Sequence, residues 1–526
     1  MANDKQQTTV LRLLKKGRRN FFGVLFSRTG LITLSLLVNV ALLILVFVRF
    51  EQYLPHFWGS AVVFTAVMVL LLLSTRIDAS AKVTWLILFI ALPVAGAVLF
   101  AFTRLELGHR ALKKQVEGRI AATRSCLQQN EEALASLAAE APGAAGLVRY
   151  VNSCGCHPVY TGTQVRYHPQ GESMLEALCA AIEKAEHFIF LEYFIVSEGE
   201  MWGRVLGLLA QKAAAGVEVR LLVDGTCEYI YLPPGYPKQL AALGIRCKMF
   251  APVTPLVSTH YNYRDHRKIA VIDGHTGFTG GINLSDEYIN ITHPHGHWKD
   301  TAAELHGPAV RSLLLLFDQL WSAGGRKPET EECLPLPAPS VAGAAGWVMP
   351  YGDCPLDDDH TGEMVYIDLL NRAQHSVRIM TPYLILDGEL ECALTFAARR
   401  GVTVELILPG IPDKQLPYAL AKTHYPALLA AGVHIYEYTP GFVHAKVLSM
   451  DGCEAVVGTI NLDYRSLYHH FECAVWMRGT PCLADIEADF AAVREKCRRI
   501  TPDTLKKEPL WRKIAGFLLK AAAPLL

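Results

Sequence analysis

One short pattern occurs twice in the chain and constrains its fold more than any other feature. A His, a Lys two positions later and an Asp five positions beyond the Lys form this pattern, first as His266, Lys268 and Asp273 and again as His444, Lys446 and Asp451. In both copies an Asn follows the His by 17 residues, as Asn283 and as Asn461, within Gly-Gly-Ile-Asn and Gly-Thr-Ile-Asn. One copy of so short a pattern can arise by chance, whereas two copies that agree on a downstream Gly and Asn indicate an internal repeat.

Three further pairs of segments support the repeat. Residues 188–195 correspond to 377–384, residues 215–224 correspond to 400–409, and a Leu-Gly-Ile-Arg turn near 245 corresponds to an Ala-Gly-Val-His turn near 433. Each half alternates helix-period segments with short β-branched runs, which indicates α/β units whose helices cover a sheet.

The β-branched run after the first His predicts a strand at residues 268–272. Because side chains alternate across a strand, His266 and Lys268 face one side and can meet the same ligand. The first half also has about ten extra residues, around 254–263, before its motif. They predict a loop beside the site.

The residue types of the two motifs suit phosphoryl chemistry. A repeat of this kind predicts that both motifs meet at a pseudo-two-fold interface. Imidazole titrates near neutral pH, so one His can be the nucleophile while the other protonates the leaving group. Ammonium and amide donors stabilise the charge that builds on a phosphoryl group, and the chain offers them as Lys268, Lys446, Asn283 and Asn461. With two lysines present, neither a metal nor another cofactor is needed, and no ligand set at metal spacing demands one.

One ring nitrogen of each His is needed for the reaction, and a carboxylate is expected to bind the other ring nitrogen and so fix the tautomer. Glu472 lies 28 residues after His444 and is a candidate for this position; Asp300 occupies the comparable place after His266, with a few residues extra. The two motif aspartates lie too far along their strands to act on the phosphate directly. Because a Gly follows each of them, we expect them to bond the backbone near the following turn.

These residues resemble the paired HKD motifs of the phospholipase D superfamily, and the length and hydrophobic N-terminus make the chain most similar to bacterial cardiolipin synthases. The resemblance implies an α/β fold of two pseudo-symmetric phospholipase D-like repeats with the active site at their interface, preceded by N-terminal transmembrane helices. It implies a metal-free reaction through a phosphohistidine intermediate, carried by His266, Lys268, Asp273, His444, Lys446 and Asp451. By similarity His266 is the nucleophile and His444 the general acid and then base, although the symmetry of the sequence leaves the reverse assignment open.

Three functions are compatible with such a site. A cardiolipin synthase joins two phosphatidylglycerol molecules into cardiolipin and glycerol. With water as acceptor, the same site gives a membrane phospholipase D or another phosphodiesterase. A membrane-bound scaffold without activity is the third, and the intact His and Lys pairs argue against it. Formal net charge is zero, with 50 basic and 50 acidic residues among 526, which argues against nucleic acid as a partner. The oligomeric state is not predicted.

Hydrophobic residues make up 51% of the chain, and three apolar runs, 31–48, 57–74 and 83–103, are about long enough to cross a bilayer. Basic residues before the first run and after the third both favour the cytoplasmic side, which three full crossings cannot satisfy. Either one run is re-entrant or interfacial, or one basic flank is overruled. We expect a multi-pass protein of the cell membrane whose catalytic domain faces the cytoplasm, in keeping with 13 scattered cysteines that we interpret as mostly reduced.

The predicted organisation has seven parts. These are a basic segment (1–29), a membrane region (30–104), a helical tether (105–148), the first phospholipase D-like repeat (149–326), a connector rich in Pro, Ala and Gly (327–350), the second repeat (351–500) and an amphipathic C-terminal tail (501–526). The tail suits a membrane-surface helix or docking on the protein equally well.

Overall fold

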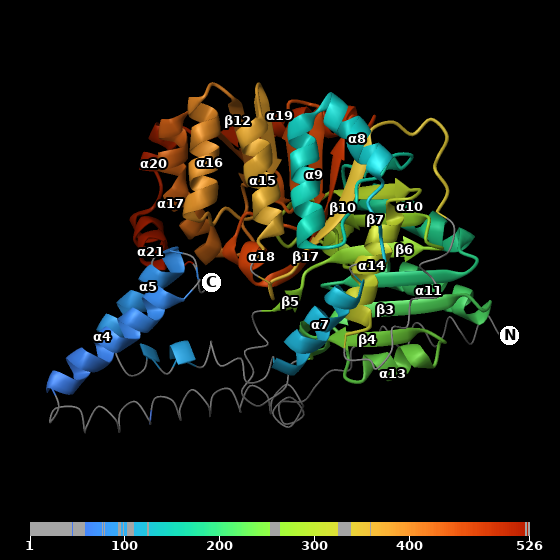
Figure 1. The fold of residues 1–526 in the computed structure, drawn as a ribbon, viewed down its shortest axis with the longest axis horizontal. Coiled ribbons are helices and arrows are strands. Elements are labelled where there is room, and N and C mark those ends of the chain that lie inside the picture. The colour runs from blue at the N-terminus through green and yellow to red at the C-terminus, as the bar shows by residue number, and fades with distance from the viewer. Residues whose placement is uncertain are drawn as a thin grey trace. The chain divides into compact units, whose positions relative to one another are not determined.

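The computed structural model describes residues 58–75, 77, 79–92, 96–97, 99–101, 110–123, 126–252, 263–323, 338–357 and 359–520, together with Leu45 and Ala523. The predictions for the basic N-terminus, for nearly all of the apolar run 31–48 and for the inserted loop at 254–262 lie outside these residues. The chain forms two compact units, of which the larger contains residues 112–252 and 263–516. Both repeats belong to this larger unit (Figure 1).

The first repeat is built on a seven-stranded sheet. Its spatial order is β1 (Gln164–His168), β9 (Ala302–His306), β7 (Thr276–Gly280), β6 (Lys268–Ile272), β2 (Phe188–Tyr193), β3 (Glu218–Asp224) and β4 (Arg246–Phe250). The parallel strands β2, β3 and β4 are joined by α11 (Glu200–Ala214) and by α12 (Thr226–Ile230) with α13 (Tyr236–Ala241). Helix α10 (Gly171–Lys184) precedes β2, and α14 (Val310–Trp321) follows β9. Every residue of β2 and β6 is buried, as expected for central strands covered on both faces.

The second repeat has the same strand order. It runs β10 (Trp347–Asp353), β17 (His470–Arg478), β16 (Glu454–Gly458), β15 (Val447–Met450), β11 (Ser376–Met380), β12 (Thr403–Pro409) and β13 (His434–Tyr438), and it ends with β18 (Cys497–Arg499). Its helices are α15 (Thr361–Arg372), α16 (Gly388–Arg399), α17 (Gln415–Ala431), α18 (Tyr464–Tyr468) and α19 (Leu483–Glu495). The predicted α/β fold of two repeats is therefore confirmed.

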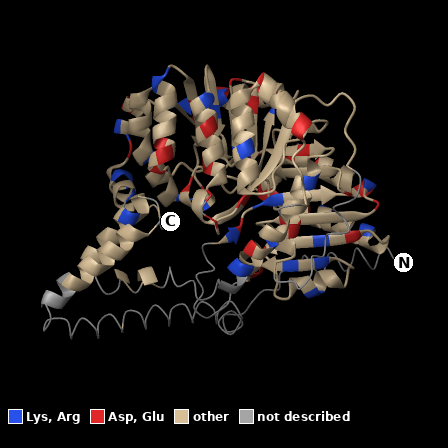
Figure 2. Ribbon diagram, viewed as in Figure 1, with Lys and Arg blue, Asp and Glu red and all other residues tan. Residues whose placement is uncertain are grey.

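A shared hydrophobic core joins the two sheets. Phe190 of β2 and Val271 of β6 belong to the same buried cluster as Phe317 of α14, Val457 of β16 and Val475 of β17. Separate cores lie on the outer faces, where α10 and α11 cover the first sheet and α9 (Pro142–Cys154), α15 and α16 cover the second (Figure 1). Charged residues of both signs are distributed over the helices and strands of both repeats (Figure 2).

Two predicted connecting segments are more ordered than the sequence indicates. β10 begins at Trp347, inside the predicted connector, and Pro350 is accommodated because β10 is the edge strand of its sheet. The predicted tether contains α7 (Arg110–Thr123) and α8 (Glu131–Glu140), and neither is a free linker. Arg119 of α7 forms an ion pair with Asp318 of α14, and α8 packs its Leu137 into the core of the second repeat.

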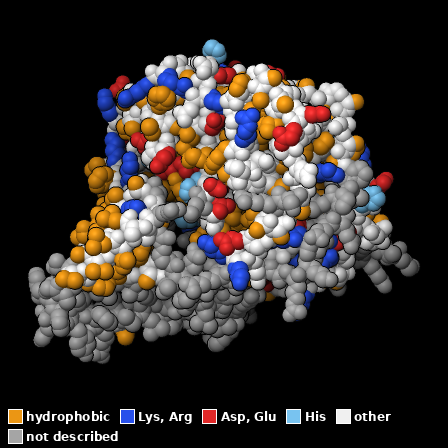
Figure 3. Space-filling view, viewed as in Figure 1, with side chains coloured by type: hydrophobic (Ala, Val, Ile, Leu, Met, Phe, Trp, Pro, Cys, Tyr) orange, Lys and Arg blue, Asp and Glu red, His pale blue; other side chains and the backbone are white. Residues whose placement is uncertain are grey.

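The smaller unit contains α4 (Trp58–Ser74) and α5 (Ala79–Ala91), whose Leu72, Trp85 and Phe89 form a small apolar cluster. Many of their other apolar side chains are exposed, and hydrophobic side chains gather over these helices in the space-filling view (Figure 3). Among the helices of the described residues, none is both long enough and apolar enough to cross a membrane.

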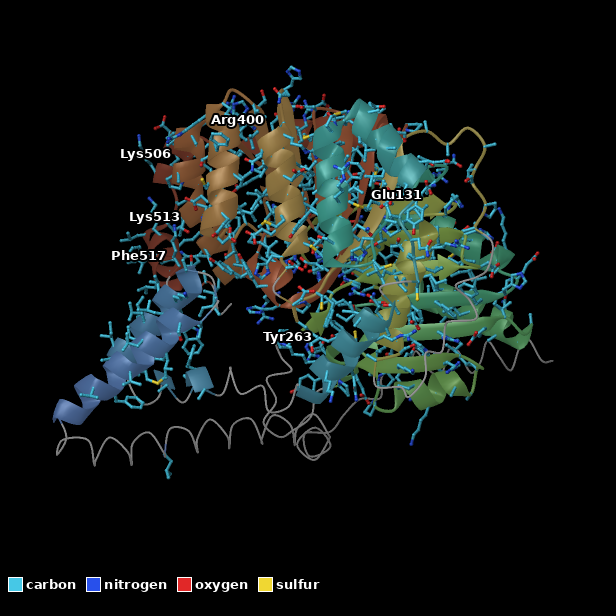
Figure 4. The ribbon with its side chains drawn as sticks, viewed as in Figure 1. Glu131, Tyr263, Arg400, Lys506, Lys513 and Phe517 are labelled. Carbon is cyan, nitrogen blue, oxygen red and sulfur yellow. The ribbon has the colours of Figure 1, made fainter. Side chains whose placement is uncertain are left out.

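The C-terminal tail forms α20 (Pro502–Lys506) and α21 (Leu510–Lys520). Lys506 and Lys513 lie on these two helices, and Phe517 follows on α21 (Figure 4). Exposed apolar side chains, among them Ile514 and Phe517, lie on α21 together with basic ones, and the amphipathic character of the tail stays a prediction.

Candidate active site

The backbone brings the first motif to the second repeat. Strand β5 (Arg264–Asp265) pairs in parallel with β17, so that Arg264 lies opposite His470 and Asp265 opposite Phe471. The next residue, His266, continues this pairing, because its N–H donates to the carbonyl oxygen of Phe471 at 3.0 Å. This register places His266 beside Glu472.

The reciprocal pairing brings the second motif to the first repeat. Strand β14 (Gly441–Val443) pairs in parallel with β8 (His297–Lys299). The N–H of His444 then donates to the carbonyl oxygen of Lys299 at 2.7 Å, which places His444 beside Asp300. The two short parallel pairings are therefore pseudo-equivalent and form both halves of the site.

Each catalytic His candidate pairs with a carboxylate of the other repeat. Nδ1 of His266 lies 2.8 Å from Oε1 of Glu472, and Nδ1 of His444 lies 2.6 Å from Oδ2 of Asp300. Both predicted carboxylates lie beside an imidazole, but each was counted from the His of its own repeat. The structure exchanges them, because each motif is carried on a strand added to the other half. A neutral imidazole that donates Nδ1–H to a carboxylate keeps a lone pair on Nε2, which is the atom left for chemistry.

The charge of each motif lysine acts on the imidazoles of both halves of the site. Lys268 and Lys446 are buried, and burial lowers the pKa of Lys268 to about 8 and that of Lys446 to about 7. Burial also lowers the pKa of both imidazoles, and the charges of both lysines lower each of them further. The ammonium group of each lysine donates to the carbonyl oxygen of its own motif His, Lys268 to His266 at 2.5 Å and Lys446 to His444. Nζ of Lys446 also lies 3.1 Å from Nε2 of His444.

Burial has the opposite effect on the carboxylates. It raises the pKa of Glu472 to about 7 and that of Asp300 to about 6. Because carboxylates and lysines both titrate near neutral pH, the groups of the site share a small number of protons. Such a cluster can release or accept a proton without a large change in energy.

The two asparagines differ in their contacts. Oδ1 of Asn283 accepts from the N–H of Ile195 at 2.9 Å, and its Nδ2 donates to the hydroxyl of Tyr288 at 2.7 Å. Oδ1 of Asn461 is buried without a hydrogen-bond partner in the described part of the chain. Their role in binding phosphate stays a prediction.

The motif aspartates hold strand ends rather than the imidazoles. Asp273 accepts the backbone N–H groups of residues 186, 187 and 188 at 2.8 Å, where β2 begins. Asp451 accepts those of residues 374, 375 and 376 at 2.7 to 2.8 Å, where β11 begins. Both have positive φ, of 51° and 53°. The expectation of a backbone-binding role is met, but at the turn before β2 or β11 and not at the turn after the motif. The contacts of these two residues are structural, although the resemblance groups them with the catalytic residues.

Several residues of the site were given no role in the prediction from sequence. The hydroxyl of Thr459 donates to Glu472, whereas Gly281 stands at the equivalent position beside Asp300. The ring of His470 lies 5.4 Å from that of His266, and the ring of Trp298 lies 5.3 Å from that of His444. His470 and Glu472 are two residues apart on one strand, and this spacing is the signal from which the sequence reading could have found His470.

Comparisons with known proteins show which family the chain is similar to. The sequence model of a family described as "Cardiolipin synthase, PLD-like domain" matches residues 178–319 and 366–494. A Streptococcus mutans protein named only as uncharacterized is 50% identical over 458 residues, which cover 87% of this chain and 99% of that protein. Cardiolipin synthase of Geobacillus kaustophilus is 33% identical over 447 residues, covering 84% of this chain and 88% of its own. The crystal structure of phosphatidylserine synthase from Haemophilus influenzae covers 73% of this chain and 100% of its own, with a TM-score of 0.56 at 16% identity, and shows the similarity of the fold.

Proposed function

We propose that this chain, which belongs to the cardiolipin synthase family of phospholipase D-like proteins, joins two phosphatidylglycerol molecules into cardiolipin and glycerol. The proposal rests on two buried contacts, each between an imidazole of one repeat and a carboxylate of the other. Burial and the charges of two lysines lower the pKa of both imidazoles. One imidazole can attack phosphorus while the other moves a proton, which is what a two-step transfer requires.

In the first step His266 is the nucleophile. Glu472 holds its Nδ1–H, so Nε2 attacks the phosphorus of the first lipid, and the bond from phosphorus to the glycerol headgroup oxygen breaks. That oxygen takes a proton from Nε2 of His444, which Asp300 stabilises in its protonated form. When the negative phosphodiester binds, it offsets the positive charges of the lysines. The pKa of His444, which burial and those charges lower, therefore rises.

In the second step His444 acts as the base. The headgroup hydroxyl of a second phosphatidylglycerol gives its proton to Nε2 of His444 and attacks phosphorus, and the bond from phosphorus to His266 breaks. Cardiolipin leaves, and both imidazoles return to their starting protonation states. Lys268, Lys446 and the two asparagines stabilise the negative charge on the non-bridging oxygens in both steps, so the reaction needs no metal.

The proposed substrates place the protein at a membrane. Both are two-tailed lipids that are available only in a bilayer, and α4 and α5 expose apolar side chains such as Val63, Leu70 and Ile90. We accordingly propose a multi-pass protein of the cell membrane that uses the apolar runs 31–48, 57–74 and 83–103, with the catalytic unit facing the cytoplasm.

The direct test uses purified protein in mixed micelles with labelled phosphatidylglycerol, a chelator and chromatographic separation of the products. The proposal predicts cardiolipin and glycerol in equal amounts. Phosphatidic acid as the product would show that water is the acceptor and would replace the synthase with a phospholipase D. Turnover that needs an added metal would contradict the metal-free mechanism.

A further inference from the structure

A third imidazole lies beside the proposed nucleophile. His470 and Glu472 are two residues apart on β17, so both side chains project from the same face of the strand. The ring of His470 is inclined by 42° to the ring of His266, and its Nδ1 lies 3.9 Å from Oε1 of Glu472. One ligand atom from each of His266, His470 and Glu472 lies within 4.8 Å of the other two.

The nitrogens of His470 are not used by the fold. The side chain is 91% buried, and within the described residues neither Nδ1 nor Nε2 has a hydrogen-bond partner. A buried polar group without a partner costs free energy and points to a ligand or water that fills the place. The mechanism proposed above gives this imidazole nothing to do.

In the other half of the site, a residue that cannot bind a metal takes the place of His470. Trp298 stands two residues before Asp300, as His470 does before Glu472, and its ring is inclined by 43° to that of His444. An indole nitrogen is only a hydrogen-bond donor and cannot coordinate a metal, whereas an imidazole nitrogen can. The two halves therefore differ by one potential metal ligand.

We propose that His266, His470 and Glu472 form a binding site for a transition-metal ion such as Zn²⁺, and that the ion inhibits the protein by occupying the nucleophile. Two imidazoles and one carboxylate, with a fourth position left for water or a phosphate oxygen, form a donor set that Zn²⁺ accepts. Coordination leaves His266 without the lone pair that would attack phosphorus: an ion on Nε2 uses that lone pair, and an ion on Nδ1 displaces the ring proton to Nε2. The inhibitory effect rests on the proposed function, whereas the binding of the ion does not.

The geometry of the three side chains suits a single ion. Nδ1 of His266 lies 2.8 Å from Oε1 of Glu472, and Nδ1 of His470 lies 3.9 Å from the same oxygen. Two imidazole nitrogens therefore face one carboxylate oxygen, which is the arrangement that a shared ion requires.

Full-length protein, purified in detergent and stripped with a chelator, tests the site. Equilibrium dialysis against ZnCl₂ is expected to give one strongly bound ion, and Co²⁺ is expected to give the intense visible bands of tetrahedral coordination. His470→Trp copies the residue of the other half and is expected to weaken Zn²⁺ binding more than about tenfold. His444→Ala, the matched control, is expected to keep the ion. His470→Gln, with a thermal melt of each variant, guards against loss of the fold.

Inhibition is measured as the ratio of turnover with and without Zn²⁺. That ratio is expected to fall in the natural protein and to stay near one in His470→Trp. Equal Zn²⁺ affinity of the natural protein and His470→Trp would overturn the proposed site, as would loss of the ion in His444→Ala. Tight binding by a protein that makes no cardiolipin in the absence of Zn²⁺ would leave the site intact and overturn the proposed function instead.

Discussion

The two halves of the active site have the same backbone arrangement but hold their carboxylates differently. Glu472 receives a hydrogen bond from the hydroxyl of Thr459. At the equivalent position of the first repeat, Gly281 leaves space for Asp300: a Cβ there would lie 2.1 Å from Oδ1 of Asp300. One half therefore positions its carboxylate with a side-chain hydroxyl, whereas Asp300 accepts the backbone N–H of Thr301 and lies against a glycine.

What the halves share is equally informative. Asp273 and Asp451 each bind three successive backbone N–H groups at the start of a central strand. The repeat thus preserves the contacts that fix the backbone, while the groups around each imidazole differ. This difference supports the proposal that the two imidazoles have separate roles although their motifs are alike.

Removing either imidazole has the largest expected effect. His266→Ala and His444→Ala are each expected to lower turnover of phosphatidylglycerol by about 10⁴-fold, since each removes a group that acts on the reacting atoms. A lipid phosphodiester with a p-nitrophenol leaving group separates the roles, because that leaving group needs no proton. We expect it to restore release of p-nitrophenol in a single turnover of His444→Ala but not in His266→Ala. The opposite pattern would exchange the two roles.

The crossed pairing is tested next. Glu472→Gln and Asp300→Asn are each expected to lower kcat roughly 10²-fold or more, because an amide does not stabilise the correct imidazole state. When Glu472→Gln is combined with His266→Ala, little further loss is expected, whereas its combination with His444→Ala lowers kcat further. Steady-state kinetics of the four proteins in each cycle would contradict the pairing if Glu472 proved coupled to His444.

Making the halves more alike is expected to cost less. Gly281→Ala places a Cβ against Asp300 and is expected to lower kcat about tenfold to 100-fold by displacing that carboxylate. Thr459→Val removes the hydroxyl that binds Glu472 and is expected to cost about tenfold, whereas Thr459→Ser keeps the hydroxyl and serves as its control. Full activity of Gly281→Ala would show that Asp300 needs no such space.

The pH dependence is expected to be a smaller effect over the range near neutrality. A lysine whose pKa is lowered carries its charge below that pKa and loses it as the pH rises through it. Lys446 and Lys268 should therefore lose their charges in turn, near pH 7 and near pH 8. Each loss is expected to lower kcat/KM on the alkaline side by up to about tenfold per pH unit. A guanidinium stays protonated, so Lys446→Arg is expected to shift this alkaline fall upward. A profile that is level to pH 10 would contradict the lowered pKa values.

The motif aspartates are expected to affect turnover least. Asp273→Asn and Asp451→Asn each weaken three backbone contacts, at an expected cost of about 1–3 kcal/mol in the free energy of unfolding. Denaturant titration measures that cost, and it should be similar in both halves. A loss of kcat as large as that of the His variants, in protein that is fully folded, would show that these aspartates act on the phosphate.

The α/β fold of two repeats and the strand at 268–272 follow from the sequence, because the paired motifs and the matching segments reveal the repeat. The crossed carboxylates do not, since β5 with β17 and β8 with β14 join segments far apart in the chain. The start of β10 was predicted to be part of a connector because that segment is rich in Pro, Ala and Gly, whereas pairing with β17 makes it a strand. Gly281 and Thr459 occupy equivalent places, and only their contacts show what each one does.

The central claim is a covalent intermediate on His266, and mass spectrometry of trapped protein tests it most directly. His444→Ala lacks the base that activates the acceptor, so a donor with a p-nitrophenol leaving group should load the protein and remain attached. Digestion under alkaline conditions, which preserve phosphohistidine, is predicted to give one phosphatidyl adduct on the peptide that contains His266, and His266→Ala should give none. An adduct on His444 in the His266→Ala protein, together with none on His266 in the His444→Ala protein, would contradict this mechanism.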